Sequence, residues 1–247
     1  MPAAPALSIV IPAYNESQRL APTLTEIREY AGKSPGRIVE VIVVDDGSSD
    51  DTAALARNFN VAPAALRILV NERNRGKGYC VRRGVLEAGG DAILTCDADG
   101  STPISDVEKL LPHLTGGVAI GSRAMPESIL DPPQGAIRHI LHRLFRALRA
   151  RILLPEILDT QCGFKLFTRE AARAIFAQVR TNGFAFDCEV LALACTMGYP
   201  IREVGVTWRN DSRSAVRLFR DGAATLRDLI RIHRRVRQFS SNRPDKP

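Results

Sequence analysis

Hydrophobic and polar residues alternate along the first 122 residues as short apolar runs and amphipathic stretches. Five runs rich in β-branched residues predict strands, at Leu7–Ile11, Ile38–Val44, Leu66–Val70, Ala92–Cys96 and Val118–Gly121. Four segments between them predict helices, at Arg19–Tyr30, Thr52–Asn58, Gly78–Ala88 and Ser105–His113. This alternation predicts an α/β fold with a mostly parallel central sheet, flanked by helices in right-handed crossovers.

The pattern changes after residue 122. Pro126–Gly135 contains two consecutive prolines and predicts a loop or flap. Ala136–Leu154 has an apolar stripe at helical spacing and arginines on the opposite face, which predicts a basic amphipathic helix. Such a helix either lies in a membrane interface or packs its stripe into the core, and the sequence leaves both open. A last helix of similar character is expected over Ala223–Gln238, and Ser240–Pro247 is expected to be frayed.

Two carboxylate clusters directly follow predicted strands. Asp45-Asp46 comes after Val41–Val44, and Asp97-Ala98-Asp99 comes after the strand that begins at Ala92. The carboxyl ends of parallel strands form the edge at which open α/β sheets bind ligands. An extended Asp-x-Asp places both carboxylates on one side, where they can share one Mg²⁺ or Mn²⁺ with a substrate diphosphate. Surface acids that serve only to keep a loop soluble can also have the Asp-x-Asp pattern. The presence of acids at the ends of two strands in one domain favours a nucleoside-diphosphate site instead.

A dinucleotide site needs a G-x-G-x-x-G turn after the first strand, and this chain has Pro12-Ala13-Tyr14-Asn15-Glu16 there. Hydride transfer is therefore not expected. Asn74–Gly78 is a small basic turn at the start of a predicted helix, where backbone N–H groups and Lys77 favour phosphate. A helix N-terminus that does not bind phosphate could have the same sequence.

Composition sets the cellular context that we expect. The chain of 247 residues fits one large domain or a domain with a smaller extension, and no apolar run approaches the length of about 18 residues that spans a bilayer. No basic segment precedes the first apolar run, so no signal peptide is expected. The five cysteines lack C-x-x-C spacing, which favours reduced thiols in the cytoplasm over disulfides or zinc.

The net charge of +7 is unevenly distributed. The segment from Arg202 to Arg243 has eleven arginines and four acids. This bias suggests an anionic partner, which can be a phosphate-bearing substrate, an anionic membrane or a nucleic acid, although a solvated basic face would have the same composition. Nucleic acid is not expected, because the chain lacks a recognised motif and has few aromatic residues beside its arginines.

The ordered set of motifs resembles family 2 glycosyltransferases, and within them the dolichyl-phosphate glucosyltransferases and other polyprenyl-phosphate enzymes. The matching segments are Ile9–Glu16, Val43–Asp50, Asn74–Gly78, Asp97–Gly100, Gly121–Arg123, Asp159–Phe167 and Gly183–Glu189. The resemblance implies the GT-A fold, with a catalytic domain over residues 1–210 and a basic helical extension over 211–247. It also implies metal-dependent, inverting transfer of a hexose, glucose from UDP-glucose, to a polyprenyl or dolichyl phosphate.

The resemblance also implies a set of site residues. The nucleotide-sugar site would comprise Pro12, Ala13, Tyr14, Glu16, Asp46, Lys77, Asp97 and Ala98. Tyr14 would stack on the base, and Glu16 and Asp46 would accept hydrogen bonds from the ribose and the base. Asp97 and Asp99 would hold Mg²⁺ or Mn²⁺. Many relatives have a third ligand two residues further on, a position that the weaker donor Ser101 occupies here.

Four side chains are expected to act in catalysis, namely Asp99, Arg123, Asp187 and Glu189. Arg123 and Lys165 are expected to bind phosphate on the leaving group or the acceptor. Surface exposure is the alternative for both, and helix capping before Val190–Met197 is the alternative for the two acids.

A lipid phosphate acceptor needs no general base, whereas a hydroxyl acceptor would need Asp187, Glu189 or Asp159. A soluble enzyme for hydroxyl acceptors and a non-catalytic nucleotide-sugar module are the alternatives. For the lipid acceptor we expect a cytoplasmic enzyme with peripheral contact to the inner face of a membrane.

Overall fold

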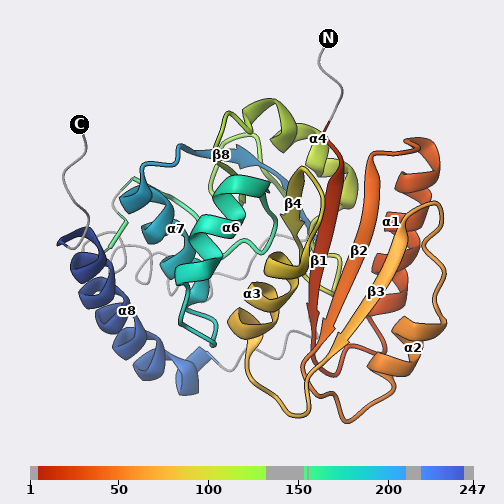
Figure 1. Cartoon of the computed structure of the whole chain (residues 1–247), viewed down its shortest axis with the longest axis horizontal. Coiled ribbons are helices and arrows are strands. Elements are labelled where there is room, and N and C mark those ends of the chain that lie inside the picture. Colours follow the sequence, from red (N-terminus) through yellow and green to blue (C-terminus); the bar gives the residue numbers. More distant parts are fainter. Residues whose placement is uncertain (1–4, 132–152, 155, 210–217, 242–247) are drawn as a thin grey trace.

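The computed structural model describes residues 5–131, 153–154, 156–209 and 218–241. Its centre is a seven-stranded sheet with the order β3-β2-β1-β4-β7-β5-β8 (Figure 1). The strands are β1 (Leu7–Ala13), β2 (Ile38–Asp45), β3 (Ala65–Val70), β4 (Ala92–Thr95), β5 (Val118–Ser122), β7 (Lys165–Thr168) and β8 (Ile201–Gly205). β7 is antiparallel to β4 and β5, and the other neighbouring strands are parallel. The predicted mostly parallel sheet is therefore confirmed.

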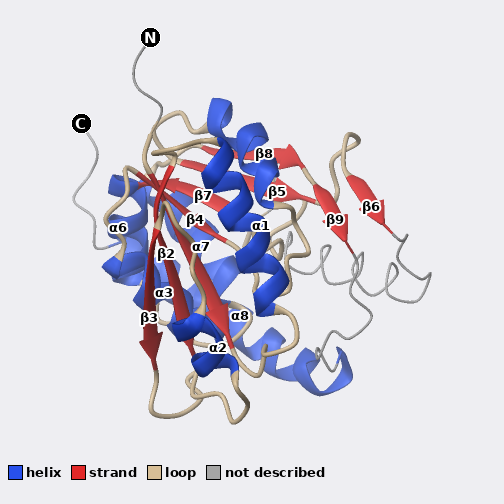
Figure 2. Ribbon diagram, turned by 90° about the vertical axis from the view of Figure 1, so that its right-hand side faces the viewer, coloured by secondary structure: helices blue, strands red, loops and turns tan. Residues whose placement is uncertain are grey.

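Helices cover both faces of this sheet (Figure 2). They are α1 (Leu20–Lys33), α2 (Thr52–Asn58), α3 (Lys77–Glu87), α4 (Val107–Leu110), α6 (Arg169–Gln178), α7 (Phe186–Met197) and α8 (Leu218–Ser241). The apolar faces of α1, α2 and α4 pack into one core cluster, and those of α3, α6 and α7 pack into another.

Side chains of the central strands alternate between these two clusters. Ile9 and Ile11 of β1 belong to the cluster with α1, whereas Val10 between them belongs to the cluster with α3. β2 repeats this division, and all of these side chains are fully buried. A strand that is buried on both faces needs continuous apolar sequence, which explains the β-branched runs.

The structure corrects several predicted boundaries. The segment predicted as a loop, Pro126–Gly135, contains the short strand β6 (Ile129–Asp131), which pairs with β9 (Thr207–Arg209). The helix predicted over Ser105–His113 is divided into η1 (Ile104–Asp106), α4 and η2 (Leu111–His113). Pro112 lacks an N–H group and cannot continue the hydrogen-bond ladder of α4.

The two predicted basic helices have different outcomes. Residues 136–152 of the first lie outside the described ranges, and Leu153 and Leu154 at its end are not helical. The second is α8, which is longer at both ends than predicted, so Ser240 and Ser241 are helical rather than frayed. Residues 242–247 lie outside the described part of the chain. Leu229 and Ile232 of α8 are buried in a small cluster with Cys188 of α7, and the two helices lie side by side (Figure 1).

Topology brings the predicted site residues to one edge of the sheet. Parallel β1, β2 and β4 end there, at Ala13, Asp45 and Thr95. Because β7 is antiparallel to β4, its first residue, Lys165, pairs with Thr95 at the same edge. Among the helices that the structure describes, none is long and apolar enough to cross a membrane.

Candidate active site

The loop that follows β1 is attached to the loop that follows β2. Pro12 and Ala13 end β1, and Asn15 has a left-handed φ of 54°. Asn15 donates its N–H to Ser48 Oγ at 2.9 Å and accepts the N–H of Ser49 at 2.9 Å. The ring of Tyr14, whose residue is 47% exposed, therefore lies on a fixed loop at the surface. This position suits the expected stacking on a base, which stays a prediction.

Asp46 organises the turn that leads to Lys77. Its buried carboxylate accepts the N–H groups of Arg75 and Gly76, each at 2.8 Å, and the Asn71 side-chain amide at 2.7 Å. These contacts direct the carboxylate toward the protein backbone rather than toward a nucleotide. Direct contact of Asp46 with a ribose or base stays a prediction. Its hydrogen bonds to the turn at Arg75 and Gly76 are present in the structure.

Lys77 is the first residue of α3 and forms an ion pair with Asp97. The Nζ–Oδ1 distance is 2.5 Å, and the two side chains are 21% and 22% exposed. Burial alone would lower the pKa of Lys77, but the charges of Asp97 and Asp187 more than offset burial and raise it. The ammonium therefore stays charged and lies beside the Asp-x-Asp segment, as phosphate binding requires.

Asp97 and Asp99 lie in a turn after β4, and not in the extended conformation that the sequence predicted. The strand ends at Thr95, and Gly100, with a φ of 63°, donates its N–H to the carbonyl of Asp97 at 3.3 Å. Ala98, which the resemblance assigned to the nucleotide-sugar site, is buried in the core cluster with α1. The turn leaves the two carboxylates partly exposed, each 22%.

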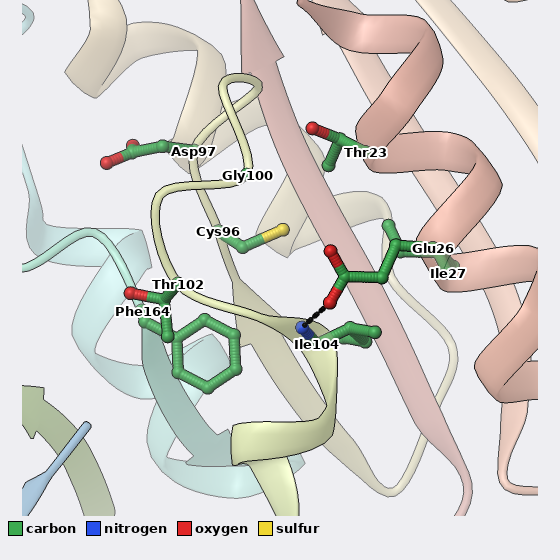
Figure 3. A pocket seen from close by; sticks show the side chains of 9 residues that line it. All are labelled: Thr23, Glu26, Ile27, Cys96, Asp97, Gly100, Thr102, Ile104 and Phe164. Atoms are coloured by element: carbon green, nitrogen blue, oxygen red, sulfur yellow. Dashed lines mark hydrogen bonds between the residues drawn. The ribbon is translucent and has the colours of Figure 1, made fainter. Parts of the chain in front are cut away.

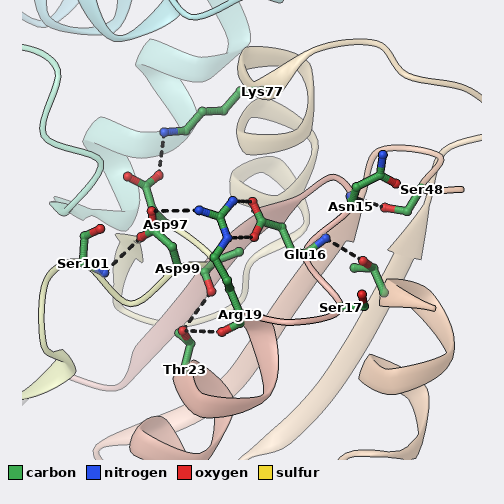
Figure 4. Close-up of polar contacts among 12 residues, drawn as sticks. Asn15, Glu16, Ser17, Arg19, Thr23, Ser48, Lys77, Asp97, Asp99 and Ser101 are labelled. Carbon is green, nitrogen blue, oxygen red and sulfur yellow. Dashed lines mark hydrogen bonds and ion pairs between the residues drawn. The ribbon is translucent and has the colours of Figure 1, made fainter. Parts of the chain in front are cut away.

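Arg19 joins Asp99 to Glu16 (Figure 4). Its guanidinium forms two hydrogen bonds to Glu16, at 2.5 and 2.6 Å, and its Nη1 lies 3.9 Å from Asp99 Oδ2. Burial raises the pKa of Glu16, and the negative charges of Asp99 and Asp97 add to this effect although Arg19 opposes it. Sequence reasoning missed Arg19, which follows Glu16 by one helical turn.

The Asp-x-Asp turn has the chemistry of a hard-cation site. Both carboxylates offer oxygen, the donor type that Mg²⁺ and Mn²⁺ prefer. Within the described ranges no group of three or more His, Cys, Asp or Glu residues is arranged to hold a metal. Ser101 uses its N–H on Asp99 at 3.0 Å. An ion at Asp97 and Asp99 would therefore need further oxygen ligands from a diphosphate or water, and the residues fit that arrangement.

A small pocket lies between the Asp-x-Asp turn and α1 (Figure 3). Thr23, Glu26, Asp97, Thr102 and Phe164 contribute to its lining. Thr102 Oγ1 is buried and has no hydrogen-bond partner in the part of the chain that the structure describes. The pocket leaves this one hydroxyl free beside the turn that carries Asp97.

Lys165 and Asp187 form a buried ion pair. Their side chains are 2% and 6% exposed, the Nζ–Oδ1 distance is 2.5 Å, and Lys165 also donates to the carbonyl of Cys162. Burial raises the pKa of Asp187 although Lys165 and Lys77 oppose it. A solvated face for Lys165, one of the two interpretations of the sequence, is therefore wrong. Burial alone would raise the pKa of Asp97, but the charges of Lys77 and Lys165 lower it.

Arg123 is fixed between an acid and an aromatic ring. Its Nε and Nη2 donate to the two oxygens of Asp159 at 2.7 and 2.8 Å, and its guanidinium carbon lies 4.6 Å from the Trp208 ring centroid. Burial alone would raise the pKa of Asp159, but Arg123 lowers it well below its usual range. Asp159 is therefore a weak base.

Glu189 is directed away from these groups. Its carboxylate accepts the N–H groups of Arg180 and Thr181 at 3.0 and 2.7 Å and pairs with Arg235 of α8 at 3.1 Å. None of these three partners is Lys77, Asp97 or Lys165. Both predicted acids lie in the first turn of α7, but Asp187 pairs with Lys165 whereas Glu189 pairs with Arg235.

Comparisons with known proteins agree with this geometry. A family model described as "Glycosyl transferase family 2" matches residues 8–176. The chain is 40% identical over 240 residues to a dolichyl-phosphate beta-glucosyltransferase of Drosophila melanogaster, covering 92% of this chain and 74% of that protein. It is 37% identical over 243 residues to the Homo sapiens protein of the same name, covering 93% and 75%.

Solved structures with the same fold are more distant in sequence. Mannosyl-3-phosphoglycerate synthase from Rubrobacter xylanophilus has a TM-score of 0.68 at 20% identity, over 98% of this chain and 78% of that one. Glucosyl-3-phosphoglycerate synthase from Mycobacterium tuberculosis, in complex with Mn²⁺, UDP and glucosyl-3-phosphoglycerate, has a TM-score of 0.64 at 21% identity, over 98% and 82%. These likenesses confirm the GT-A fold expected from the sequence.

Proposed function

This chain belongs to glycosyl transferase family 2, and we propose that it transfers glucose from UDP-glucose to a polyprenyl phosphate such as dolichyl phosphate. The chain is a hexosyltransferase by its family and its relatives. The named activity of those relatives, at 37–40% identity over more than nine-tenths of this chain, supports the choice of sugar and acceptor.

The donor diphosphate would bind at the edge of the sheet between Lys77 and the Asp-x-Asp turn. The N–H groups of Gly76 and Gly78 donate to Asp46 and to the Asn182 carbonyl, so the contact from α3 would come from Lys77, whose ionised form its neighbours favour. Asp97 and Asp99 would hold Mg²⁺ or Mn²⁺ together with diphosphate oxygens. The bound ion would neutralise negative charge on the departing diphosphate.

Transfer would proceed in one step with inversion. An ionised oxygen of the acceptor phosphate attacks the anomeric carbon of glucose, and the bond from that carbon to the donor diphosphate breaks on the opposite face. The electron pair of the broken bond leaves with UDP. Lys77 stabilises this charge where it develops, and no covalent intermediate with the enzyme is needed.

One observation carries the choice of acceptor: the three carboxylates that could deprotonate a hydroxyl all have cationic partners. Asp187 is paired with Lys165, Asp159 with Arg123, and Glu189 with Arg235. Proton acceptance by any of them would break an ion pair that is present in the structure, at 2.5 Å for Asp187, 2.7 Å for Asp159 and 3.1 Å for Glu189. An acceptor phosphate is already ionised at neutral pH, so it requires no such base.

The outer side of α8 supports contact with a membrane. Exposed residues along it are Arg227, Arg231, Arg234 and Arg237, and Ile230 among them is 42% exposed. Basic residues near an anionic bilayer each contribute about 1 kcal/mol of binding. We therefore place the enzyme at the cytoplasmic face of a membrane, as a peripheral protein that reaches a lipid acceptor.

Product analysis tests this function. Purified protein is incubated with UDP-glucose, GDP-mannose or UDP-N-acetylglucosamine, each with dolichyl phosphate or with a simple hydroxyl acceptor, and products are identified by mass spectrometry. We expect glucosyl phosphodolichol from UDP-glucose alone. Transfer to the hydroxyl acceptor in preference to the lipid would refute the acceptor, and a preference for another nucleotide sugar would refute the donor.

A further inference from the structure

Arg235 of the C-terminal helix makes polar contacts with the loop between α6 and α7, in addition to the apolar cluster that Leu229 and Ile232 form with Ala185. Arg235 of α8 forms an ion pair with Glu189, with Nη1 3.1 Å from Oε1, and its Nη2 donates to Thr181 Oγ1 at 3.0 Å. The Glu189 side chain is 2% exposed, whereas that of Arg235 is 37% exposed. The buried carboxylate of Glu189 is therefore paired with a guanidinium, that of Arg235, which is partly exposed to solvent.

Glu189 transmits this contact to the backbone of the loop. Its Oε2 accepts the N–H groups of Arg180 and Thr181, which fixes the orientation of both peptide groups. The carbonyl of the next residue, Asn182, accepts the N–H of Gly78 at 2.7 Å. Gly78 follows Lys77 in the first turn of α3. Only a few hydrogen bonds thus separate α8 from the proposed phosphate-binding turn.

The contact between loop and turn leaves no free space. A Cβ atom at Gly76 would lie 2.4 Å from the carbonyl oxygen of Asn182, and one at Gly78 would lie 2.4 Å from that of Thr181. Real Cβ atoms do not approach backbone this closely. A displacement of the loop must therefore displace the start of α3 or open a gap beside it, since packed elements do not deform continuously.

We propose that Glu189 and Arg235 are positioning residues, through which α8 holds the Lys77 turn in the geometry that binds the donor diphosphate. The proposal rests on the proposed function of that turn. It assigns to Glu189 a role different from proton acceptance, and it couples the helix with the basic outer side to donor affinity. Arg235 contacts Glu189 and Thr181 through two different nitrogens of one planar group, a geometry that the single nitrogen of a lysine does not reproduce.

UDP affinity in the absence of lipid tests the proposal. Isothermal titration calorimetry with Mn²⁺ compares the parent protein, Arg235→Gln, Arg235→Lys and Arg173→Gln, which removes an exposed arginine of α6. We expect Arg235→Gln to weaken UDP binding about tenfold, an effect of the size seen for residues that couple to a distant site. Arg235→Lys should recover part of the loss, and Arg173→Gln should bind UDP like the parent.

Kinetics and hydrogen exchange separate positioning from general stability. For Arg235→Gln we expect the KM for UDP-glucose to rise more than kcat falls, and the Gly78 amide to exchange faster than in the parent. Parent-like UDP affinity with a lowered Tm would overturn the proposal, because the pair would then only stabilise the fold. If Arg235→Gln does not fold, Glu189→Gln is measured in its place, and parent-like affinity in that variant overturns the proposal equally. Absence of UDP binding to the parent itself would refute the proposed function instead.

Discussion

Replacing Gly163 with alanine should disable the site without unfolding the protein. Gly163 lies against Asp97, and a Cβ atom there would be 2.4 Å from Oδ2, 2.5 Å from Oδ1 and 2.5 Å from Cγ. Gly163 does not have a left-handed φ, so alanine can adopt its backbone conformation. The added methyl group must therefore push the carboxylate aside.

The size of the effect follows from these distances. Ordinary contact with a Cβ begins near 3.4 Å, so the Asp97 carboxylate must move by about 1 Å. A displacement of about 1 Å in a catalytic group costs about 100-fold in rate, which equals about 2.7 kcal/mol of transition-state stabilisation. We therefore expect kcat/KM for UDP-glucose to fall about 100-fold while the Tm stays close to that of the parent.

Transfer kinetics with UDP-glucose and dolichyl phosphate, together with thermal unfolding, provide the assay. Gly32→Ala in α1 is the matched control, because a Cβ at that position meets nothing within 4 Å. A folded Gly163→Ala protein with the transfer rate of the control would refute the reasoning, since Asp97 would then not need its present position.

Three further predictions concern the Asp-x-Asp turn, a buried glutamate of β2 and the basic side of α8. Asp99→Asn should fold normally but lose the Mn²⁺-dependent part of UDP binding in calorimetry, and a metal response equal to the parent's would contradict the metal assignment. Burial alone would raise the pKa of Glu40, but hydrogen bonds from Ser8, the Gly89 N–H and Arg67 lower it below 4.5. Glu40→Gln should therefore reduce the free energy of unfolding by about 1–3 kcal/mol at neutral pH. In denaturant titrations this difference should vanish as the pH falls through the lowered pKa of Glu40 in the folded state. A difference that does not depend on pH would contradict this. Changing Arg227, Arg231 and Arg237 together to Glu should reduce sedimentation with phosphatidylserine vesicles, with UDP binding unchanged, and undiminished sedimentation would exclude this side of α8 as the membrane contact.

The sequence predicts the elements near the site well because their signals are local. Strands buried on both faces are continuous apolar runs, and the helices between them carry their apolar residues at helical spacing. β6 escaped prediction because its pairing partner, β9, is far along the chain, so Ile129–Asp131 has no local signal of its own. The extended Asp-x-Asp was wrong for a different reason, since Gly100 closes a turn immediately after the strand.

The sequence predicted where several candidate site residues lie in the sheet, but not which of them form ion pairs with one another. Strand ends place Asp46 and Asp97 at one edge from sequence order alone, whereas Lys165 reaches that edge only because β7 is antiparallel to β4. Which charges pair there depends on how α7 and α8 pack on the sheet, and spacing along the chain does not contain that information. Asp187 and Glu189 illustrate the point, because they lie two residues apart in one helix turn and have different lysine and arginine partners.

Transfer of radiolabelled glucose from UDP-glucose to dolichyl phosphate, followed by determination of the anomeric configuration of the product, tests the central claim most directly. The proposed mechanism predicts a β-linked glucosyl phosphate lipid, formed by the parent protein in the presence of Mg²⁺ or Mn²⁺ and not by Asp97→Asn. An α-linked product, or label that appears only on hydroxyl acceptors, would contradict it.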